Sequence, residues 1–249
     1  MIFLVGTVAF ICEYFDSGLG MGYGTALAPI LILAGYHPLQ IVPAILVSQF
    51  FTDVAACIFH QNVRNVNFKF GSADFKIASF LGVISTVGVI IASTIALKIS
   101  RWLLTFYIGL LVLCVGIAIL VTAKRSVVFS WRKIVALSFF ASFNKGISGG
   151  GYGPLVMGGQ LLSGVCPKSA VGITAFAEAI TCLVGFAVYY AMGKKIDWGL
   201  TILLTLCAIP AVPFAALTIK KINSGVLKKC VGFLIIALGI LTLFKLGSS

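Results

Sequence analysis

The sequence predicts an all-α, polytopic membrane protein made of two repeated halves, and three observations support this. The chain has 249 residues and is 60% hydrophobic but only 10% charged, whereas soluble domains carry about 25% charged residues. Its mean hydropathy is +1.14, and its apolar residues form runs long enough to cross a bilayer, which takes ~20 residues. A glycine-rich segment occurs twice, at Phe15–Gly24 and Asn144–Gly153, each time inside such a run.

Two of the apolar runs are too long for one crossing. A straight helix over Ile2–Ala34 would measure ~50 Å against a hydrocarbon core of ~30 Å, and Ile134–Leu162 is also too long. Both contain the glycine segment, so we expect each to form two shorter helices joined by irregular backbone. The remaining runs have the length of one crossing; they are Ile41–His60, Phe75–Leu97, Leu103–Ala123, Ala170–Met192, Leu200–Ile219 and Val226–Phe244.

The repeat continues beyond the glycine segments. With Gly22–Gly24 aligned on Gly151–Gly153, other glycines, prolines and lysines also match. We therefore divide the chain into a first transmembrane repeat (1–123), a basic cytoplasmic linker (124–133) and a second transmembrane repeat (134–249). The matched pairs are Gly20 with Gly149, Gly35 with Gly164, Pro38 with Pro167 and, after a short gap, Lys98 with Lys221, Gly109 with Gly232 and Gly116 with Gly239.

The orientation of the halves depends on what each broken run does. If it crosses the membrane, the halves are parallel; if it forms a hairpin, each half has three further transmembrane helices and the halves are inverted. The hairpin alternative gathers more basic residues on one side, which fits the positive-inside rule better. It places both termini outside. The basic clusters are Arg64/Lys69/Lys76, Lys98/Arg101, Lys124/Arg125/Arg132/Lys133, Lys168, Lys194/Lys195, Lys220/Lys221/Lys228/Lys229 and Lys245.

Charge and cysteine usage exclude several classes. The net charge of +12 comes mostly from short loops, which indicates contact with anionic lipid headgroups rather than nucleic acid. The seven cysteines show no C-x-x-C spacing. Packing between helices is the simpler explanation for them, with a metal or redox site as the alternative. No cofactor or metal is predicted.

The glycine breaks are the strongest indication of a binding site. Irregular backbone is tolerated at membrane depth only where protein or a water-filled cavity covers it. In the second break Lys145 is a cation inside an apolar run, where an ammonium is costly unless it faces a cavity or a partner. The following helix would direct its free N–H groups and positive dipole end to the same place. The second half-site comprises Asn144, Lys145, Ser148, Gly149, Gly150, Gly151 and Tyr152.

The first break would form the matching half-site, with Ser17, Gly20, Gly22 and Tyr23 as substrate-binding residues and Asp16 in register with Lys145. One cation, neutral donors and two helix N-termini describe a site for a small oxyanion. The alternative is that the glycines only permit close packing and that Lys145 pairs with Asp16.

Carboxylates inside the apolar runs are candidates for ion coupling. Glu178 aligns with Gln49 in the repeat, and both are expected near the midplane with Asp16 and Asp53. A buried glutamate can take up and release a proton, so H+ is the expected coupling ion; a structural hydrogen bond from Glu178 to Thr174 or Tyr152 is the alternative. Asp53, Cys57 and His60 share one helix face, as a proton path or as a buried polar stripe.

Three other motifs carry less weight. Gly146–Gly150 fits G-x-S-x-G, which makes a membrane-embedded serine hydrolase a rival, but no histidine follows residue 60. The glycines at 20, 22 and 24 resemble a nucleotide loop without the βαβ unit that such a loop needs. The seven-residue spacing of Gly109/Gly116 and of Gly232/Gly239 places small residues on one helix face, as membrane packing requires.

The spacing of glycine and proline resembles the TauE/SafE sulfite exporter family, also known as the toluene sulfonate uptake permease group. The resemblance rests on G-x-G-x-G-x-x-x-x-P from Gly20 to Pro29, on G-G-G-Y-G-P from Gly149 to Pro154, and on the G-x-x-P that follows each. It implies secondary transport of sulfite, organosulfonates or similar small anions across the prokaryotic cytoplasmic membrane. Met21 stands where the second half has Gly150, so the half-sites differ chemically.

From these features we expect a multi-pass protein of the prokaryotic inner membrane that is not an enzyme. It would carry sulfite, thiosulfate or an organosulfonate by alternating access at a midplane site between the two breaks. A carrier of another small anion, such as a carboxylate, is the main alternative; a serine hydrolase at Ser148 and a non-transporting scaffold are weaker ones. The expected partners are the anion, H+ and the lipid bilayer, and an oligomer is compatible with the sequence.

Overall fold

A computed structural model describes residues 2–122, 131–162, 165–218 and 224–247, and these are helical apart from short connections. The predicted linker at 124–133 lies mostly outside the described residues, as does Gly164. Long, predominantly apolar runs explain why helices form here, since every backbone group in a bilayer must be satisfied within its own segment. The first half comprises α1 (Ile2–Leu19), α2 (Tyr23–Leu33), α3 (Pro38–Asn62), α4 (Ala73–Ala96) and α5 (Arg101–Thr122).

The second half repeats this order with one extra break. The predicted run at Leu200–Ile219 is one span of 20 residues over Trp198–Leu217, but it is interrupted at Ile209 and Pro210. Pro210 and Pro213 lack the N–H that would bond to the preceding turn, which explains the interruption. The helices are α6 (Trp131–Ser148), α7 (Tyr152–Leu162), α8 (Pro167–Ala191), α9 (Trp198–Ala208), α10 (Ala211–Thr218) and α11 (Ser224–Gly247).

The prediction that both long runs are broken is confirmed. The first run ends one helix at Leu19 and starts the next at Tyr23, and the second run does the same at Ser148 and Tyr152. Glycine is required at the breaks because Gly20, Gly22, Gly149 and Gly151 all have φ between 67° and 136°, a region that side chains disfavour. Glycine residues thus occupy equivalent strained positions in both halves.

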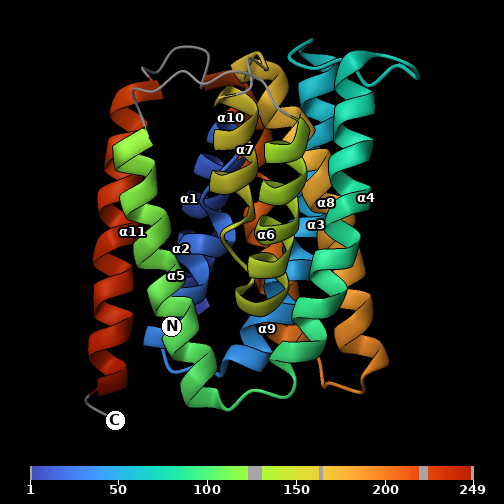
Figure 1. Ribbon diagram of the computed structural model, residues 1–249. Coiled ribbons are helices and arrows are strands. Elements are labelled where there is room, and N and C mark those ends of the chain that lie inside the picture. The colour runs from blue at the N-terminus through green and yellow to red at the C-terminus, as the bar shows by residue number, and fades with distance from the viewer. Residues whose placement is uncertain (1, 123–130, 163–164, 219–223, 248–249) are drawn as a thin grey trace.

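Helices α3 and α8, which carry Gln49 and Glu178, run in opposite directions. In Figure 1 the α2–α3, α4–α5 and α8–α9 connections lie at the lower end of the bundle, and the α3–α4 connection lies at the upper end. Both termini are in the lower part of the view. The contacts agree: Gln49 of α3 bonds to Glu178 of α8, while Asn65 beyond α3 meets Ser169 at the start of α8. α3 and α8 are therefore antiparallel at the centre.

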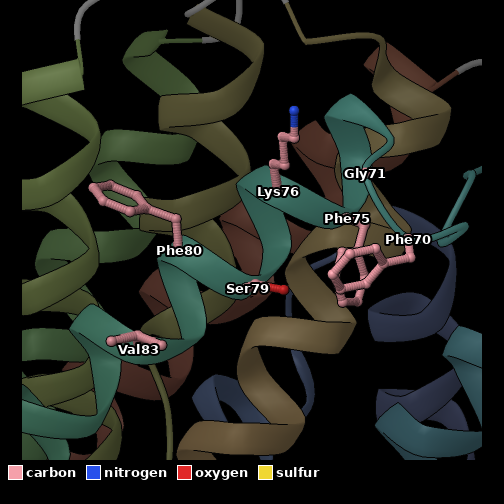
Figure 2. Close-up of a pocket in the computed structure, with 7 residues that line it drawn as sticks. All are labelled: Phe70, Gly71, Phe75, Lys76, Ser79, Phe80 and Val83. Atoms are coloured by element: carbon pink, nitrogen blue, oxygen red, sulfur yellow. The ribbon is translucent and has the colours of Figure 1, made fainter.

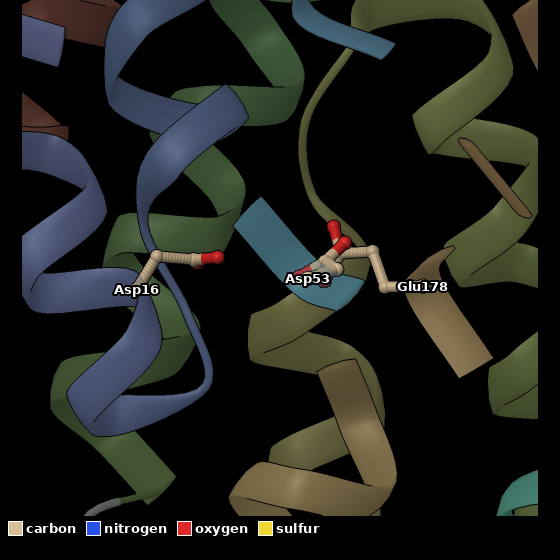
Figure 3. Close-up of side chains that lie close together, drawn as sticks. All are labelled: Asp16, Asp53 and Glu178. Atoms are coloured by element: carbon tan, nitrogen blue, oxygen red, sulfur yellow. The ribbon is translucent and has the colours of Figure 1, made fainter. Parts of the chain in front are cut away.

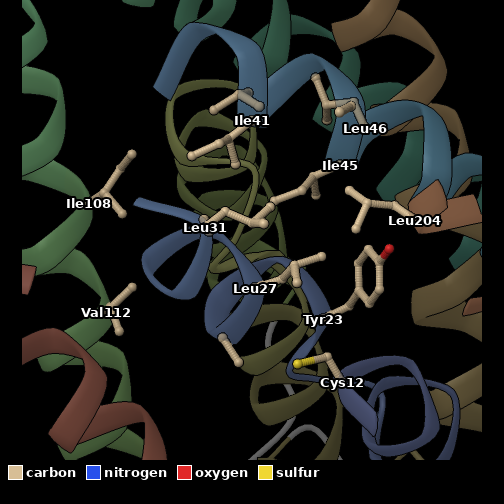
Figure 4. Packing of buried hydrophobic residues seen from close by; sticks show 14 of the residues in the cluster. Cys12, Tyr23, Leu27, Leu31, Ile41, Ile45, Leu46, Ile108, Val112 and Leu204 are labelled. Carbon is tan, nitrogen blue, oxygen red and sulfur yellow. The ribbon is translucent and has the colours of Figure 1, made fainter. Parts of the chain in front are cut away.

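Both halves contribute to one hydrophobic core. In Figure 4 side chains of α2 pack against α3 on one side and face α5, while Leu204 of α9 reaches the same cluster. Because the cluster joins helices of both repeats, the halves form one bundle. Its labelled members include Leu27, Leu31, Ile41, Ile45, Leu46, Ile108 and Val112.

Small residues allow close helix packing in the pair α5–α11, as the glycine spacing predicts. A Cβ atom on Gly239 would lie 2.8 Å from the backbone nitrogen of Leu113, and one on Gly109 would lie 2.9 Å from Leu243. Such separations are too short for an ordinary side-chain contact. Glycine therefore brings the two helices together, as small residues do in membranes.

The outer surface is apolar, as a surface facing lipid should be. Along α4, a groove of about 410 Å³ is lined by the exposed side chains of Phe70, Phe80 and Val83. Lys76 stands at its upper edge in Figure 2, where a long cationic side chain can reach the headgroups. Five described spans, α9 and α10 counting as one, are long and apolar enough to cross a membrane.

Candidate functional site

The two glycine breaks cross each other with their backbones in contact. A Cβ atom on Gly24 would collide with the carbonyl oxygen of Gly149, and one on Gly153 would collide with the carbonyl oxygen of Gly20. Residues that correspond in the two halves differ by 129 in number, as Gln49 and Glu178 do. Under this correspondence, the contact of Gly24 with Gly149 is equivalent to the contact of Gly153 with Gly20. All four glycines are buried. The breaks therefore meet in a symmetric crossing that excludes side chains.

Lys145 lies beside this crossing, near the end of α6, and its side chain is buried. Its ammonium donates to Glu178 Oε1 at 2.7 Å and to Gln49 Oε1. Gln49 Nε2 in turn donates to Glu178 Oε1 at 3.0 Å and to Asp16 Oδ2 at 3.1 Å. The alternative in which Lys145 pairs directly with Asp16 is thus wrong for this state, because Gln49 lies between them.

These four residues form a central polar quartet from four helices: Asp16 of α1, Gln49 of α3, Lys145 of α6 and Glu178 of α8. The contact between Asp16 and Gln49 corresponds, under the repeat offset, to the contact between Lys145 and Glu178. The alternative hydrogen bond from Glu178 to Thr174 or Tyr152 does not form. Thr174 instead accepts from Gln160 Nε2 at 2.8 Å.

Asp16 and Lys145 lie at equivalent helix ends but differ in whether they can cap the helix that follows. Asp16 Oδ1 accepts from the backbone N–H of Tyr23 at 3.2 Å, so a carboxylate caps the positive N-terminus of α2. At the start of α7 the equivalent group is an ammonium, which cannot accept a hydrogen bond. There Gly151 N–H donates to Thr25 Oγ1 at 2.9 Å, a contact from the other half that the sequence did not predict.

Three carboxylates converge at this place, and two of them belong to the quartet. One oxygen each from Asp16, Asp53 and Glu178 lie within 4.8 Å of one another, and all three residues are buried. Figure 3 shows Asp53 and Glu178 directed at one another, with Asp16 pointing toward them from α1. The predicted ion-coupling residues therefore lie together. A cation, if one binds, would have its ligands here.

The predicted hydroxyl and amide donors are engaged with other groups in this state. Ser17 Oγ donates to Glu13 Oε1 at 2.5 Å. Ser148 Oγ donates to the carbonyl of Asn144 at 2.8 Å and accepts from Gly150 N–H at 3.1 Å, while Asn144 Oδ1 accepts from Tyr107. Their role as ligands for an anion remains a prediction. The contacts of Ser148 Oγ are with the backbone of Asn144 and Gly150 and with no histidine, so no base activates it as a nucleophile.

The tyrosines of the two Gly-Tyr-Gly motifs are fully buried and bond to serines of different helices. Tyr23 Oη lies 2.7 Å from Ser48 Oγ of α3, and Tyr152 Oη lies 2.9 Å from Ser85 Oγ of α4. The two rings fix the helices that follow the breaks. Their partners could not be deduced from the repeat because α3 and α4 are not repeat-equivalent.

A bundle whose interrupted helices cross in its interior beside buried ionisable groups has the architecture of a secondary transporter. The comparison with known proteins names the family. The profile of the sulfite exporter TauE/SafE family matches residues 4–242, and the chain belongs to that family. It is 24% identical over 252 residues to the "Probable membrane transporter protein YtnM" of Bacillus subtilis (strain 168), which covers 96% of this chain and 81% of that protein. No solved structure matches the chain significantly.

These findings establish a membrane transporter rather than an enzyme, in a multi-pass arrangement in the prokaryotic cell membrane. The serine hydrolase alternative is thereby set aside, as is a scaffold without transport activity.

Proposed function

We propose that the protein carries a small sulfur-containing anion (sulfite, thiosulfate or an organosulfonate) by alternating access at the crossing of the two breaks. One observation supports this most. Among the lysines and arginines whose burial the structure describes, Lys145 is fully buried and the others are not. It lies at the crossing, in a member of a sulfite exporter family. An ammonium at this depth is costly unless a partner or a substrate neutralises it.

In the structure described here, Glu178 occupies the position that an anion would take on Lys145. Their 2.7 Å contact must lengthen before a substrate oxygen can replace the carboxylate. Protonation of Glu178 would remove its charge and release the ammonium, so uptake of H+ and binding of the anion would favour each other. This is the coupling we propose, with Gln49 and Asp16 holding Glu178 in place.

The remaining ligands would come from the breaks. Ser148, Gly149 and Gly150 lie directly before α7, whose N-terminus attracts negative charge. In the first half Ser17, Gly20 and Gly22 lie before α2 in the same way, and Tyr23 is its first residue. An oxyanion with several oxygens could accept from both sides. Because Asp16 already caps α2, we propose that the second half provides most of the binding.

Alternating access would use the opposite directions of the two halves. We propose that they are inverted repeats: α3 and α8 are antiparallel, and the paired helices α1–α2 and α6–α7 enter from opposite ends in Figure 1. Rocking one half against the other would then open the crossing first to one side and then to the other.

The test is anion flux in proteoliposomes. Radiolabelled sulfite, thiosulfate, taurine and lactate are offered with and without an inward pH gradient to three proteins: the natural chain, the double variant Lys145→Met/Glu178→Gln, and Lys76→Met as a control at an exposed lysine. We expect flux of a sulfur anion that the gradient accelerates, that the control retains and that the double variant loses. Preference for lactate would instead support a carboxylate carrier. Full flux in a folded double variant would disprove the assignment of Lys145.

A further inference from the structure

We propose that Asp16, Asp53 and Glu178 form a binding site for a sodium ion between α1, α3 and α8. The proposal deepens the function above, since it assigns a second occupant to the carboxylates of the coupling site. Na+ and protons would compete for the same three groups, because either neutralises them.

The geometry of the three carboxylates suits a small hard cation. One oxygen from each lies within 4.8 Å of the others. Oxygen ligands at ~2.4 Å from an ion are separated by up to ~4.8 Å when they lie on opposite sides of it. The three groups come from separate helices, and Figure 3 shows them directed toward a common space. Hard cations prefer such carboxylate oxygens.

Asp53 provides an independent indication of a missing ligand. It is 3% exposed, and its Oδ2 has no hydrogen-bond partner within the part of the chain that the structure describes. A buried carboxylate oxygen without a partner is costly. Its neighbours in the cluster are acceptors as well when they are ionised, so a proton or a metal cation would have to lie among them to satisfy it.

The charge balance also favours a cation. Glu13 and Asp16 of α1, Asp53 of α3 and Glu178 of α8 are all buried, and Lys145 of α6 is the buried ammonium that faces them. One ammonium cannot compensate these carboxylates, and buried charges require compensation. Helix α1 also ends next to the cluster, and the carbonyl ends of interrupted helices coordinate Na+ in transporters.

Glu178 would connect the cation to the transported anion. The same oxygen, Oε1, accepts from Lys145 at 2.7 Å and belongs to a residue of the carboxylate cluster. A sodium ion on Glu178 would compete with the ammonium and leave Lys145 free for an anion. A monovalent ion fits this role better than a divalent one, because a coupling ion must also leave the site.

The experiment measures Na+ alone, without an anion substrate, on the purified full-length chain in detergent at alkaline pH. Binding of radioactive Na+ and the shift of the thermal unfolding midpoint with NaCl are compared with choline chloride at the same ionic strength. We expect saturable binding and a higher midpoint in Na+. Asp53→Asn should weaken Na+ binding by about 10- to 100-fold, as loss of a charged ligand does. Asp74→Asn, in the first turn of α4 and outside the carboxylate cluster, should leave it unchanged.

Absence of saturable Na+ binding to the natural chain would overturn the proposal, and this result does not depend on any variant folding. Unchanged Na+ affinity in Asp53→Asn would also overturn it, as would stabilisation by Ca2+ but not by Na+. Since no anion is present, these outcomes are separate from failure of the proposed function, which is measured by sulfur-anion flux and by the Lys145 variants.

Discussion

The first glycine break carries an acid where the second carries a base. Asp16 and Lys145 occupy equivalent positions, yet Asp16 caps the following helix through Tyr23 N–H and Lys145 is committed to Glu178. The backbone around them is nearly the same, with positive φ at matching glycines. The comparison teaches that one backbone arrangement, present at both breaks, can carry different ionisable groups. A symmetric fold can therefore contain an asymmetric site.

The largest effect should come from breaking the ion pair of the second half. Lys145→Met leaves Glu178 charged and buried, and loss of one partner of a buried pair costs about 3–5 kcal/mol. The double variant Lys145→Met/Glu178→Gln removes both charges and should recover most of that stability. The free energy of unfolding, measured by SDS titration in mixed micelles, checks this prediction.

Lys76→Met is the matched control for that series, because Lys76 is exposed at the start of α4. If Lys145→Met is as stable as the natural chain, the contact between Lys145 and Glu178 does not stabilise the structure. The two breaks would then not differ in the stability that their ionisable groups contribute.

A second test addresses the scaffold rather than the charges. Gly24→Ala and Gly153→Ala each place a methyl group against a carbonyl of the opposite break, and overpacking of this kind costs about 1–3 kcal/mol. Both variants should lose stability, Gly24→Ala more than Gly153→Ala, because its methyl group would come closer to the opposite carbonyl oxygen. Gly158→Ala, where nothing lies within 4 Å, should be neutral or slightly stabilising in its helix.

Thermal unfolding of the three alanine variants in detergent gives the comparison. A large loss at only one of the two crossing positions would show that the backbone contact is not symmetric.

Much of the scaffold could be predicted from the sequence, because it depends on run length and on glycine. Ile2–Ala34 is too long for one crossing, and the break fell at its glycines, Gly20 and Gly22. The interruption between α9 and α10 was missed, although Pro210 and Pro213 signal it. The total length of that run fits a single crossing, so its length did not indicate a break.

The partners of the charged groups could not be predicted in the same way. The repeat shows that Asp16 corresponds to Lys145, but correspondence does not say which groups face each other across the bundle. Gln49 separates them because α3 passes between α1 and α6 at this depth. Thr25 was likewise missed: it accepts from Gly151 of the opposite break, and such a contact depends on the crossing itself.

Removing the acid of the first break should cost less than removing the base of the second. Asp16→Ala deletes the acceptor for Tyr23 N–H, and loss of an N-cap costs ~1 kcal/mol. It also removes one of the two acceptors of Gln49 Nε2, so that only the bond to Glu178 remains and one N–H loses its partner. We expect a total near 2 kcal/mol. A loss larger than that of Lys145→Met, under the same SDS titration, would reverse the ranking of the two halves.

The smallest effects on stability should come from the hydrogen bonds of the two buried tyrosines, which fix the helices after the breaks through different serine partners. Ser48→Ala removes the partner of Tyr23, and Ser85→Ala removes the partner of Tyr152. Each substitution removes a hydrogen bond of a buried hydroxyl and should cost about 1–2 kcal/mol. Tyr23→Phe and Tyr152→Phe remove the other member of each pair, so double-mutant cycles isolate the contact itself. Equal coupling energies would show that the two tyrosines anchor their breaks equally, although Tyr23 bonds to α3 and Tyr152 bonds to α4. A coupling energy of zero for Tyr152 would mean that packing alone positions α7.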